Sequence, residues 1–407
     1  MHAAWGGNKE LSRLDYVTAW HALTLRLFTD RDGEWAFVTT NSIVQGDQPA
    51  RLFAPIFAAG WRIKFAHRTF AWDSQAPGKA AVHCVIIGFT RNPDAKARLF
   101  KYEHARGQAR EAPGVKTINA YLVDGPNVLV AKRSKPLSPD ISGIMRGSMA
   151  SDGGRLLISA QELPEVMADP VAAKYVRPYV GARELLHSDE RWCLWLTDAS
   201  GPEIHASPVL YERVEGVRRF RAASTAASTR EYPHHHLFRQ IQPLATDYVC
   251  IPRVVSELRP YFPVQLMPQT VIASDATFQC PDPDGFQFAM LSSSMFLTWQ
   301  KTVGGRLESR LRFGSTLTWT TLPLPPLAEG QRETIIAAGQ KVLAARALHP
   351  ERSLAQHYTA LGMDPTLLKA HDALDTEVDK AFGASRRCRT ELERQELLFT
   401  RYAELTG

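Results

Sequence analysis

The sequence predicts a mixed protein made of three successive parts: an incomplete α/β sheet, an α+β region and a small helical region. Helix and strand patterns alternate over the first 100 residues, and short, irregular segments rich in Pro and Gly follow. Helical spacing dominates after the proline-rich stretch that ends at Leu327. We therefore expect domains at residues 1–100, 101–325 and 326–407.

The first part has the element order of the C-terminal part of a doubly wound sheet. Apolar residues recur at helical spacing in residues 14–28, and a second helix is expected at residues 49–60. Strands are predicted at residues 34–40, 61–70 and 81–89. Because no helix pattern separates the last two strands, we expect them to be antiparallel.

The middle part predicts several short strands and two longer helices. The helices are expected at residues 208–224 and 286–303, and residues 270–280 are expected to form a strand. In the C-terminal part, Thr390 and Glu393 have the spacing of a capping box, which predicts the start of a helix.

Composition and motifs exclude several classes of protein. With 44% apolar residues, 22% charged residues and a net charge of +6, the chain is typical of a globular protein that permits a polyanionic partner. The five cysteines have no CxxC spacing, which favours a reducing cytoplasm over a disulfide framework. No apolar run is long enough to span a membrane.

Motifs for nucleotide or metal chemistry are absent from the sequence. It has no G-x-G-x-x-G after a strand, no phosphate-binding loop and no H-E-x-x-H. The adjacent residues His234, His235 and His236 would point in different directions, so we expect a histidine-rich loop and no metal site.

The stretch GGRLESRLRF, residues 304–313, alternates between charged and mostly apolar residues. As one continuous strand it would place Arg306, Glu308, Arg310 and Arg312 on the same face. Such a row could be a solvated sheet surface or a set of base readers. Arg can bind guanine through two hydrogen bonds, and Glu can accept one from the amino group of cytosine.

Further basic residues leave two interpretations open. Arg218, Arg219 and Arg221 lie on one predicted helix, and Arg253 follows Pro252. Each could contact a DNA phosphate, which would fix the register of the protein on DNA without reading sequence. A solvated surface is an equally good interpretation.

Several segments resemble the family of MmeI-like restriction-modification enzymes. AFVTTNSIVQGDQ, IKFAHRTFAW and GKAAVHCVIIGF resemble the last three strands of a DNA methyltransferase that modifies the adenine amino group with S-adenosylmethionine. INAYLVDGPNVLV, RWCLWLTDAS and TVGGRLESRLRF resemble the family's target-recognition domain, and LLKAHDALDTEVDKAFG resembles its C-terminal helices. The resemblance follows nearly the whole chain in order.

This resemblance implies a double-stranded DNA partner and assigns roles to individual residues. The family's base-discriminating positions match Glu308, Arg310 and Arg312, with an upstream partner position at Ala276. A small Ala can leave room for a neighbouring Arg or touch a thymine methyl group. Phe70 matches an aromatic residue that stacks on a flipped base in the family. The alternative is that Phe70 is a core aromatic at the end of a strand. Trp72 is the next candidate for the stacking role.

The sequence departs from the family pattern in the methyltransferase part. The family's glycine-rich cofactor loop and its Asn-Pro-Pro-Phe catalytic loop are absent, since the only Asn-Pro pair is Asn92-Pro93, followed by Asp94. We therefore expect this chain alone to bind S-adenosylmethionine poorly and to transfer no methyl group. A separate N-terminal methylase or nuclease chain could complete it. The alternatives are a stand-alone DNA-binding or regulatory module and a non-functional remnant.

Overall fold

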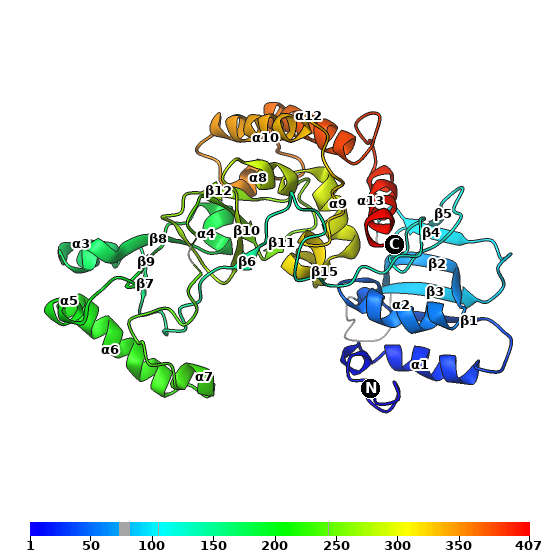
Figure 1. Cartoon of the computed structure of the whole chain (residues 1–407), viewed down its shortest axis with the longest axis horizontal. Helices are drawn as coiled ribbons and strands as arrows, with labels where there is room; N and C mark the ends of the chain where they lie inside the picture. The colour runs from blue at the N-terminus through cyan, green and yellow to red at the C-terminus, as the bar shows by residue number, and fades with distance from the viewer. Residues whose placement is uncertain (73–81, 105, 243) are drawn as a thin grey trace. The chain divides into compact units, whose positions relative to one another are not determined.

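The computed structural model describes residues 1–72, 82–104, 106–242 and 244–407 (Figure 1). Contacts divide the chain into two compact units, neither of which is continuous in sequence. The first unit comprises Met1–Asp140, Met295–Leu327 and Asp379–Gly407, and the second comprises Ile141–Ser294 and Ala328–Val378. The mixed α/β and α+β fold class predicted from the sequence is confirmed.

A five-stranded sheet with the order β1-β3-β2-β4-β5 forms the centre of the first unit. β3 is antiparallel to both of its neighbours, and β4 is parallel to β2. The antiparallel pair predicted from the absence of an intervening helix is therefore confirmed. The strands are β1 Trp35–Thr40, β2 Arg62–Trp72, β3 Val82–Thr90, β4 Arg98–Tyr102 and β5 Ala109–Glu111.

Two helices cover the same face of this sheet. The ring of His21 in the first helix lies 5.6 Å from that of Trp35, and Phe53 in the second lies 6.1 Å from Phe89. Trp35 and Phe89 are direct partners across β1 and β3, so their side chains point to one face. The helices are α1 Thr18–Leu27 and α2 Gln48–Ala58.

The buried side of α1 is not the one that its apolar spacing marks. The helix buries Thr18, His21 and Ala22 against the sheet, whereas Trp20 and Leu23 are exposed. A small residue and an imidazole fit here because the sheet already fills the space with large aromatic rings, which His21 meets edge-on. The apolar period predicted a helix correctly but did not identify its packed face.

The rest of the first unit includes a short hairpin and a C-terminal helix. Its elements are η1 Leu11–Arg13, η2 Asn41–Val44, most of α9 Ser294–Val303, β15 Gly305–Leu307, β16 Arg310–Arg312, the π-helix η4 Ser315–Trp319 and α13 Glu391–Thr406. The capping box predicted for α13 is confirmed. The Glu393 backbone N–H donates to Thr390 Oγ1 at 3.2 Å, and Thr390 N–H donates to Glu393 Oε2 at 3.0 Å.

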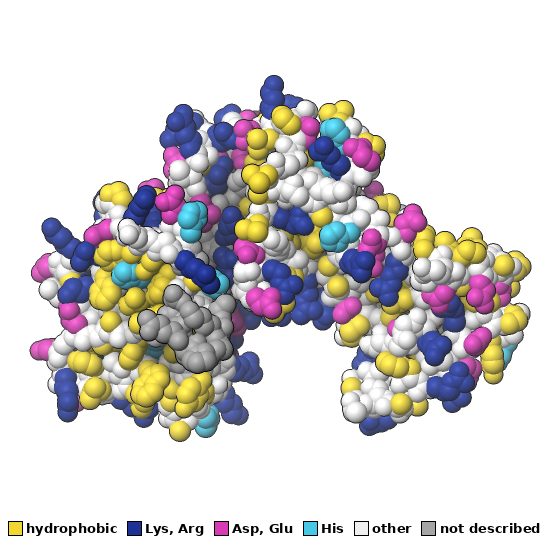
Figure 2. All heavy atoms as spheres, turned by 180° about the vertical axis from the view of Figure 1, so that it is seen from behind, with side chains coloured by type: hydrophobic (Ala, Val, Ile, Leu, Met, Phe, Trp, Pro, Cys, Tyr) yellow, Lys and Arg dark blue, Asp and Glu magenta, His cyan; other side chains and the backbone are white. Residues whose placement is uncertain are grey.

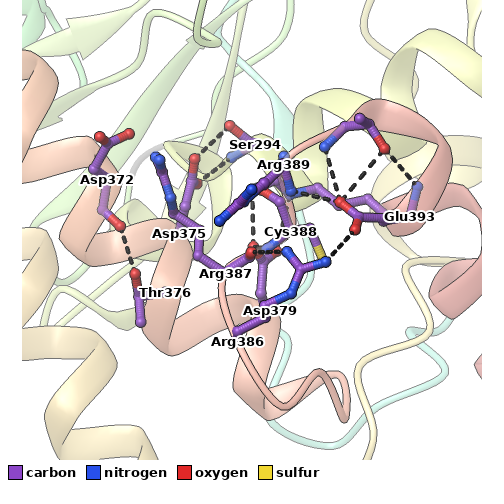
Figure 3. Close-up of polar contacts among 12 residues, drawn as sticks. Ser294, Asp372, Asp375, Thr376, Asp379, Arg386, Arg387, Cys388, Arg389 and Glu393 are labelled. Atoms are coloured by element: carbon purple, nitrogen blue, oxygen red, sulfur yellow. Dashed lines mark hydrogen bonds and ion pairs between the residues drawn. The ribbon is translucent and has the colours of Figure 1, made fainter.

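A buried ion pair fixes the segment that leads into α13. The Arg394 guanidinium donates from Nε and Nη2 to the two oxygens of Asp379, both at 2.8 Å. The Asp379 carboxylate also accepts from the Cys388 N–H at 2.8 Å (Figure 3). Because this charge pair is geometrically complete and further hydrogen-bonded, its burial is tolerated.

The second unit contains two four-stranded sheets, β12-β10-β14-β6 and β13-β8-β9-β7. The residues expected to form one strand at 270–280 instead form β13 and β14, because the chain turns between Ala273 and Thr277. The strands of the unit are β6 Met145–Arg146, β7 Leu157–Ile158, β8 Val176–Val180, β9 Trp192–Leu194, β10 Tyr248–Pro252, β11 Val254–Val255, β12 Gln265–Met267, β13 Ile272–Ala273 and β14 Thr277–Pro281.

The helix expected at residues 208–224 is confirmed as α6 Pro208–Ala222. The single buried helix expected at residues 286–303 is divided into α8 and α9 around Ser292 and Ser293. The further helices, of which α12 extends beyond the unit, are α3 Leu163–Ala168, η3 Ala172–Tyr175, α4 Ala182–His187, α5 Gly201–Ala206, α7 Ala227–Arg230, α8 Phe286–Leu291, α10 Gln331–Ala347, α11 Leu354–His357 and α12 Pro365–Ala381.

A buried polar network joins the helices of the second unit. Arg346 Nε donates to the Tyr358 hydroxyl at 2.8 Å, and this hydroxyl lies 2.9 Å from His371 Nε2. The His371 ring stacks on Tyr261 with 3.8 Å between centroids. Nearby, the Asp375 carboxylate accepts from the backbone N–H of Ser294 at 2.7 Å (Figure 3).

Two general features of the chain concern its cysteines and its helices. All five cysteines are buried and none forms a disulfide in the part of the chain that the structure describes. Over the same residues, no helix is both long enough and apolar enough to cross a bilayer.

We predict that the free energy of unfolding falls as the pH is lowered from 7 to 5.5. Burial lowers the pKa of His21 to about 4 and lowers the pKa of His371 well below its ordinary value. In the unfolded chain both groups titrate near pH ~6.5, so the unfolded state binds more protons below that pH. The loss is at most about 1.4 kcal/mol per pH unit for each histidine.

Urea denaturation at several pH values measures this slope. His21→Phe should remove its share of the pH dependence, whereas His104→Gln, at an exposed histidine, should leave the slope unchanged. Equal slopes in the wild type and in His21→Phe would contradict the assignment.

Candidate nucleic-acid interface

The segment expected to be one continuous strand at residues 304–313 is a hairpin. β15 and β16 are antiparallel, with Arg306 opposite Leu311 and Leu307 opposite Arg310. Glu308 and Ser309 form the two-residue turn between them. The expectation of a single strand is wrong because the backbone of Glu308 adopts a left-handed conformation, with φ 59°, that reverses the chain.

The hairpin separates the arginines that the alternating pattern placed together. Directly opposite residues of an antiparallel pair share a face, so Arg306 lies on the face of the buried Leu311. Arg310 and Arg312 lie on the other face and are exposed. Arg306 is half-buried, and its Nη1 donates to the Ser309 carbonyl at 2.9 Å, so it closes the turn.

Three charged side chains therefore remain available at the exposed part of the hairpin. Arg310 Nη2 and Glu308 Oε2 form an ion pair at 2.9 Å, in which the Glu308 side chain is 77% exposed. Arg312 makes no ion pair with any carboxylate that the structure describes. An exposed pair of this kind contributes about 0–1 kcal/mol, so either side chain can exchange its partner at little cost.

The turn residue itself is conformationally unfavourable. Left-handed backbone costs a non-glycine residue about 1–2 kcal/mol, and two-residue hairpin turns usually place Gly at such a position. Glu308 therefore holds its carboxylate at the tip of the hairpin in a conformation that local preference opposes. Strained residues of this kind concentrate at functional sites.

A buried glutamine anchors the base of the hairpin. Gln300 Nε2 donates to the Arg312 carbonyl at 3.0 Å, and its Oε1 accepts from Thr318 Oγ1 at 2.8 Å. Gly304 packs so closely on Gln300 that a Cβ there would clash with it. The Gly46 N–H donates to the Gly304 carbonyl at 3.3 Å, which ties the hairpin to the loop before α2.

In the second unit, Ala276 lies exposed in the turn between β13 and β14. Its carbonyl accepts from the Arg253 N–H at 3.2 Å, so these two predicted residues are neighbours. Arg146 was not predicted, but it pairs with Asp275 at 2.8 Å beside them. Only the pairing of β6 with β14 brings Arg146 here, and no local pattern marks that pairing.

The arginines of α6 have different environments. Arg218 is held by Glu215, with 2.7 Å between Nη2 and Oε2, and Arg219 is exposed. Arg221 is fully buried, and its guanidinium donates to backbone carbonyls that include those of Ala150 and Leu237. The prediction that Arg221 contacts a phosphate is therefore wrong, because its guanidinium is buried and holds backbone carbonyls.

Phe70 lies near the end of β2 and is half-buried. Its ring stacks on that of Tyr102, with 5.2 Å between centroids and an interplanar angle of 27°. Trp72 lies 6.3 Å away and is 47% exposed. One face of Phe70 is thus occupied by a protein ring, and this geometry leaves both the stacking role and the core role open.

Charged side chains of both signs lie on the surface. Figure 2 shows Lys and Arg side chains interspersed with Asp and Glu on the face that it presents. Among the described residues, no group of three or more His, Cys, Asp or Glu side chains is arranged to hold a metal ion.

Comparison with known proteins shows which family this chain resembles. Models of the MmeI DNA-methyltransferase, target-recognition and C-terminal domains match residues 1–101, 124–326 and 327–407. The chain is 31% identical to DNA methyltransferase A of Bacillus subtilis (strain 168), covering 100% of this chain and 45% of that protein.

A solved structure gives the same result. The type IIL restriction-modification enzyme MmeI in complex with DNA is 37% identical, with a TM-score of 0.88, and the match covers 100% of this chain and 54% of that one. The chain thus spans about half the length of the relatives that it matches. It belongs to the MmeI family of restriction-modification proteins and matches their methyltransferase, target-recognition and C-terminal domains.

Proposed function

We propose that this chain recognises a specific sequence in double-stranded DNA as the C-terminal half of an adenine-specific methyltransferase that uses S-adenosylmethionine. The observation that carries this proposal is the exposed hairpin tip, where Glu308, Arg310 and Arg312 project from a strained and anchored turn. The similarity to MmeI, which was solved with DNA, supports the same function.

The dimensions of the hairpin suit the major groove of DNA. Arg310 and Arg312 share a face, and residues two apart on a strand repeat every ~6.7 Å, which is close to two base-pair rises of about 3.4 Å. Arg312 would bind the O6 and N7 atoms of a guanine, and Glu308 would accept from a cytosine amino group.

The remaining predicted residues would support this reading. Ala276 would leave space beside a base or touch a thymine methyl, with Arg253 next to it. Arg218 and Arg219 would contact phosphates and fix the register of the protein. Arg306 would act indirectly, because its guanidinium already holds the Ser309 carbonyl.

Methyl transfer would require residues that this sequence does not contain. The chain has neither a glycine-rich cofactor loop nor an Asn-Pro-Pro-Phe loop, so no residue pair in it would hold the adenine amino group against a methyl donor. We therefore propose that these 407 residues alone transfer no methyl group and that further methyltransferase sequence supplies the two loops. The five buried cysteines, none in a disulfide in the described part of the chain, suit a reducing cytoplasm.

We predict that Glu308→Lys changes the base preferred at one position of the recognition site. The substitution replaces an acceptor with a donor at the hairpin tip, and a good bidentate contact discriminates between bases by about 1–3 kcal/mol. Selection from a randomised duplex library, followed by sequencing, gives the preferred base at every position.

Glu329→Lys is the matched control, because it makes the same charge change at another exposed glutamate. It should leave the preferred sequence unaltered. If Glu308→Lys strengthens binding to all sequences equally, the hairpin acts only through its charge.

Arg312→Ala and Arg219→Ala should differ in their effects on DNA binding. Loss of a base reader relaxes the preference at one base pair, whereas loss of a phosphate contact weakens binding to all sequences and lowers the salt slope by about 1. Fluorescence anisotropy at several salt concentrations, with preferred and single-mismatch duplexes, separates the two. Identical behaviour of the variants would contradict the roles given to them.

Phe70→Ala should reduce the fluorescence of 2-aminopurine placed at the target adenine, if Phe70 supports the flipped base by stacking. Removing the ring removes the surface that replaces base stacking, so the extrahelical state becomes less populated. The measurement uses an enzyme in which this chain is combined with the methyltransferase part that carries the glycine-rich and Asn-Pro-Pro-Phe loops. An unchanged signal would assign Phe70 to the core.

A further inference from the structure

A cavity of about 400 Å³ lies inside the second unit, between α4, β12, α10 and α11. Its volume is in the range of small-molecule sites in proteins. Part of its wall is apolar and consists of Leu185, Met267, Leu343, Ala347 and Leu354. The cavity also has polar side chains, and their environment indicates which ligand would fit it.

Arg346 brings a buried positive charge to this cavity. The residue is 6% exposed and forms no ion pair with a carboxylate in the part of the chain that the structure describes. Its Nη1 donates to the Val264 carbonyl at 2.8 Å and to Gln265 Oε1 at 3.3 Å. Its Nε and Nη2 both donate to the Tyr358 hydroxyl. Since a guanidinium has five N–H groups, one N–H of Nη2 has no acceptor among the described residues. Burying a charge without a counter-ion is unfavourable, so an anion in the cavity would stabilise this arrangement.

His357 provides a second buried polar group with unused hydrogen-bonding capacity. The residue is 4% exposed and lines the same cavity. Its Nδ1 is buried and has no hydrogen-bond partner among the described residues, and its Nε2, which is not fully buried, has none there either. Because buried polar groups are normally hydrogen-bonded, an unpaired imidazole in the wall of a cavity indicates a ligand that completes its hydrogen bonds.

Arg352 adds a second guanidinium to the lining, where its side chain is 35% exposed. Within the described ranges its one ion pair is with Glu351, at 3.9 Å between Nε and Oε1, and the Glu351 side chain is 66% exposed. The positive charges act on His357, whose pKa is lowered mainly by burial and further by Arg346 and Arg352.

Glu184 is the one acidic side chain in the lining as the structure describes it, and its own neighbours engage it. One carboxylate oxygen accepts from the Gly181 N–H at 2.9 Å, and the other lies 3.6 Å from Arg191 Nη1. It is therefore not available to neutralise Arg346. The lining as a whole carries an excess of positive charge, which favours an anionic ligand.

We propose that this cavity binds a small organic anion, a phosphate monoester or a carboxylate, whose charged group contacts Arg346, Arg352 and His357. The body of the ligand lies against the apolar wall. Guanidinium groups bind both carboxylates and phosphates, and small-molecule sites combine apolar walls with a few convergent polar groups. This site belongs to the second unit, whereas the hairpin tip belongs to the first, and it is separate from the reading of DNA bases.

The probes for this site are n-butyl phosphate and pentanoate, with butanol and inorganic phosphate as references. Isothermal titration calorimetry with the full 407-residue chain measures the affinity for each. We expect one of the two organic anions to bind at a single site and butanol not to bind, because it has no charge. Inorganic phosphate should bind more weakly than n-butyl phosphate, because it has no apolar body. The organic anion with the higher affinity identifies the charged group that the site takes.

Arg352→Ala and His357→Gln should each lower this affinity about tenfold, because each removes a hydrogen bond to a charged group. Arg183→Ala is the matched control, since it makes the same change at an exposed arginine of α4 that does not line the cavity. It should leave the affinity unchanged. Thermal melts verify that the variants remain folded, and the partly exposed Arg352 keeps the test valid if His357→Gln does not fold.

Four results would overturn the proposal. Neither organic anion binds, or both variants bind as tightly as the wild type. Arg183→Ala lowers the affinity as much as Arg352→Ala, which would make the effect one of diffuse surface charge. Duplex DNA displaces n-butyl phosphate, which would make the DNA backbone the source of the anion.

Discussion

The side-chain amide of Gln300 holds the base of the hairpin through a hydrogen bond to the Arg312 carbonyl. Strands of three residues contribute few backbone hydrogen bonds, so contacts at the base of the hairpin help to hold it. Gln300 is fully buried and holds both ends, through the Arg312 carbonyl and through close packing with Gly304. A buried amide that loses its hydrogen-bond partner destabilises a protein by about 1–3 kcal/mol. Displacing the hairpin from Gln300 would therefore be unfavourable.

Anchoring and strain act together at this site. The base is fixed by Gln300 and by Gly46, and the tip is closed by Arg306 on the Ser309 carbonyl. Glu308 then occupies a backbone conformation that it would not adopt alone. Side chains that are held in place before binding lose less conformational entropy on binding, so under the proposed function a rigid tip would favour discrimination between bases.

Sequence patterns predicted local features well and long-range ones poorly. The strands β1, β2 and β3 of the first sheet follow from periodicity, and the capping box of Thr390 and Glu393 follows from spacing over three residues. β4 and β5 were not predicted, because their surroundings are polar. The hairpin could not be predicted because its turn, Glu308–Ser309, contains no Gly, Asn, Asp or Pro. The alternation of charges therefore suggested one strand and placed Arg306 on the wrong face.

Two further differences have the same origin. The apolar period of α1 identified a helix, but which side is buried depends on the aromatic rings of the sheet beneath it. Arg146 reaches Asp275, which precedes Ala276, through strand pairing across about 130 residues of sequence, which no local rule describes.

The measurement that tests base reading most directly combines an atomic change in DNA with a change in the protein. Each guanine of the preferred duplex is replaced in turn by 7-deazaguanine, which lacks the N7 acceptor, and binding is measured for the wild type and for Arg312→Ala. At one guanine, the replacement should weaken binding of the wild type by about 1–3 kcal/mol. The same replacement should not weaken binding of Arg312→Ala any further. Equal losses in both proteins at every guanine, or no loss at any guanine, would contradict the account.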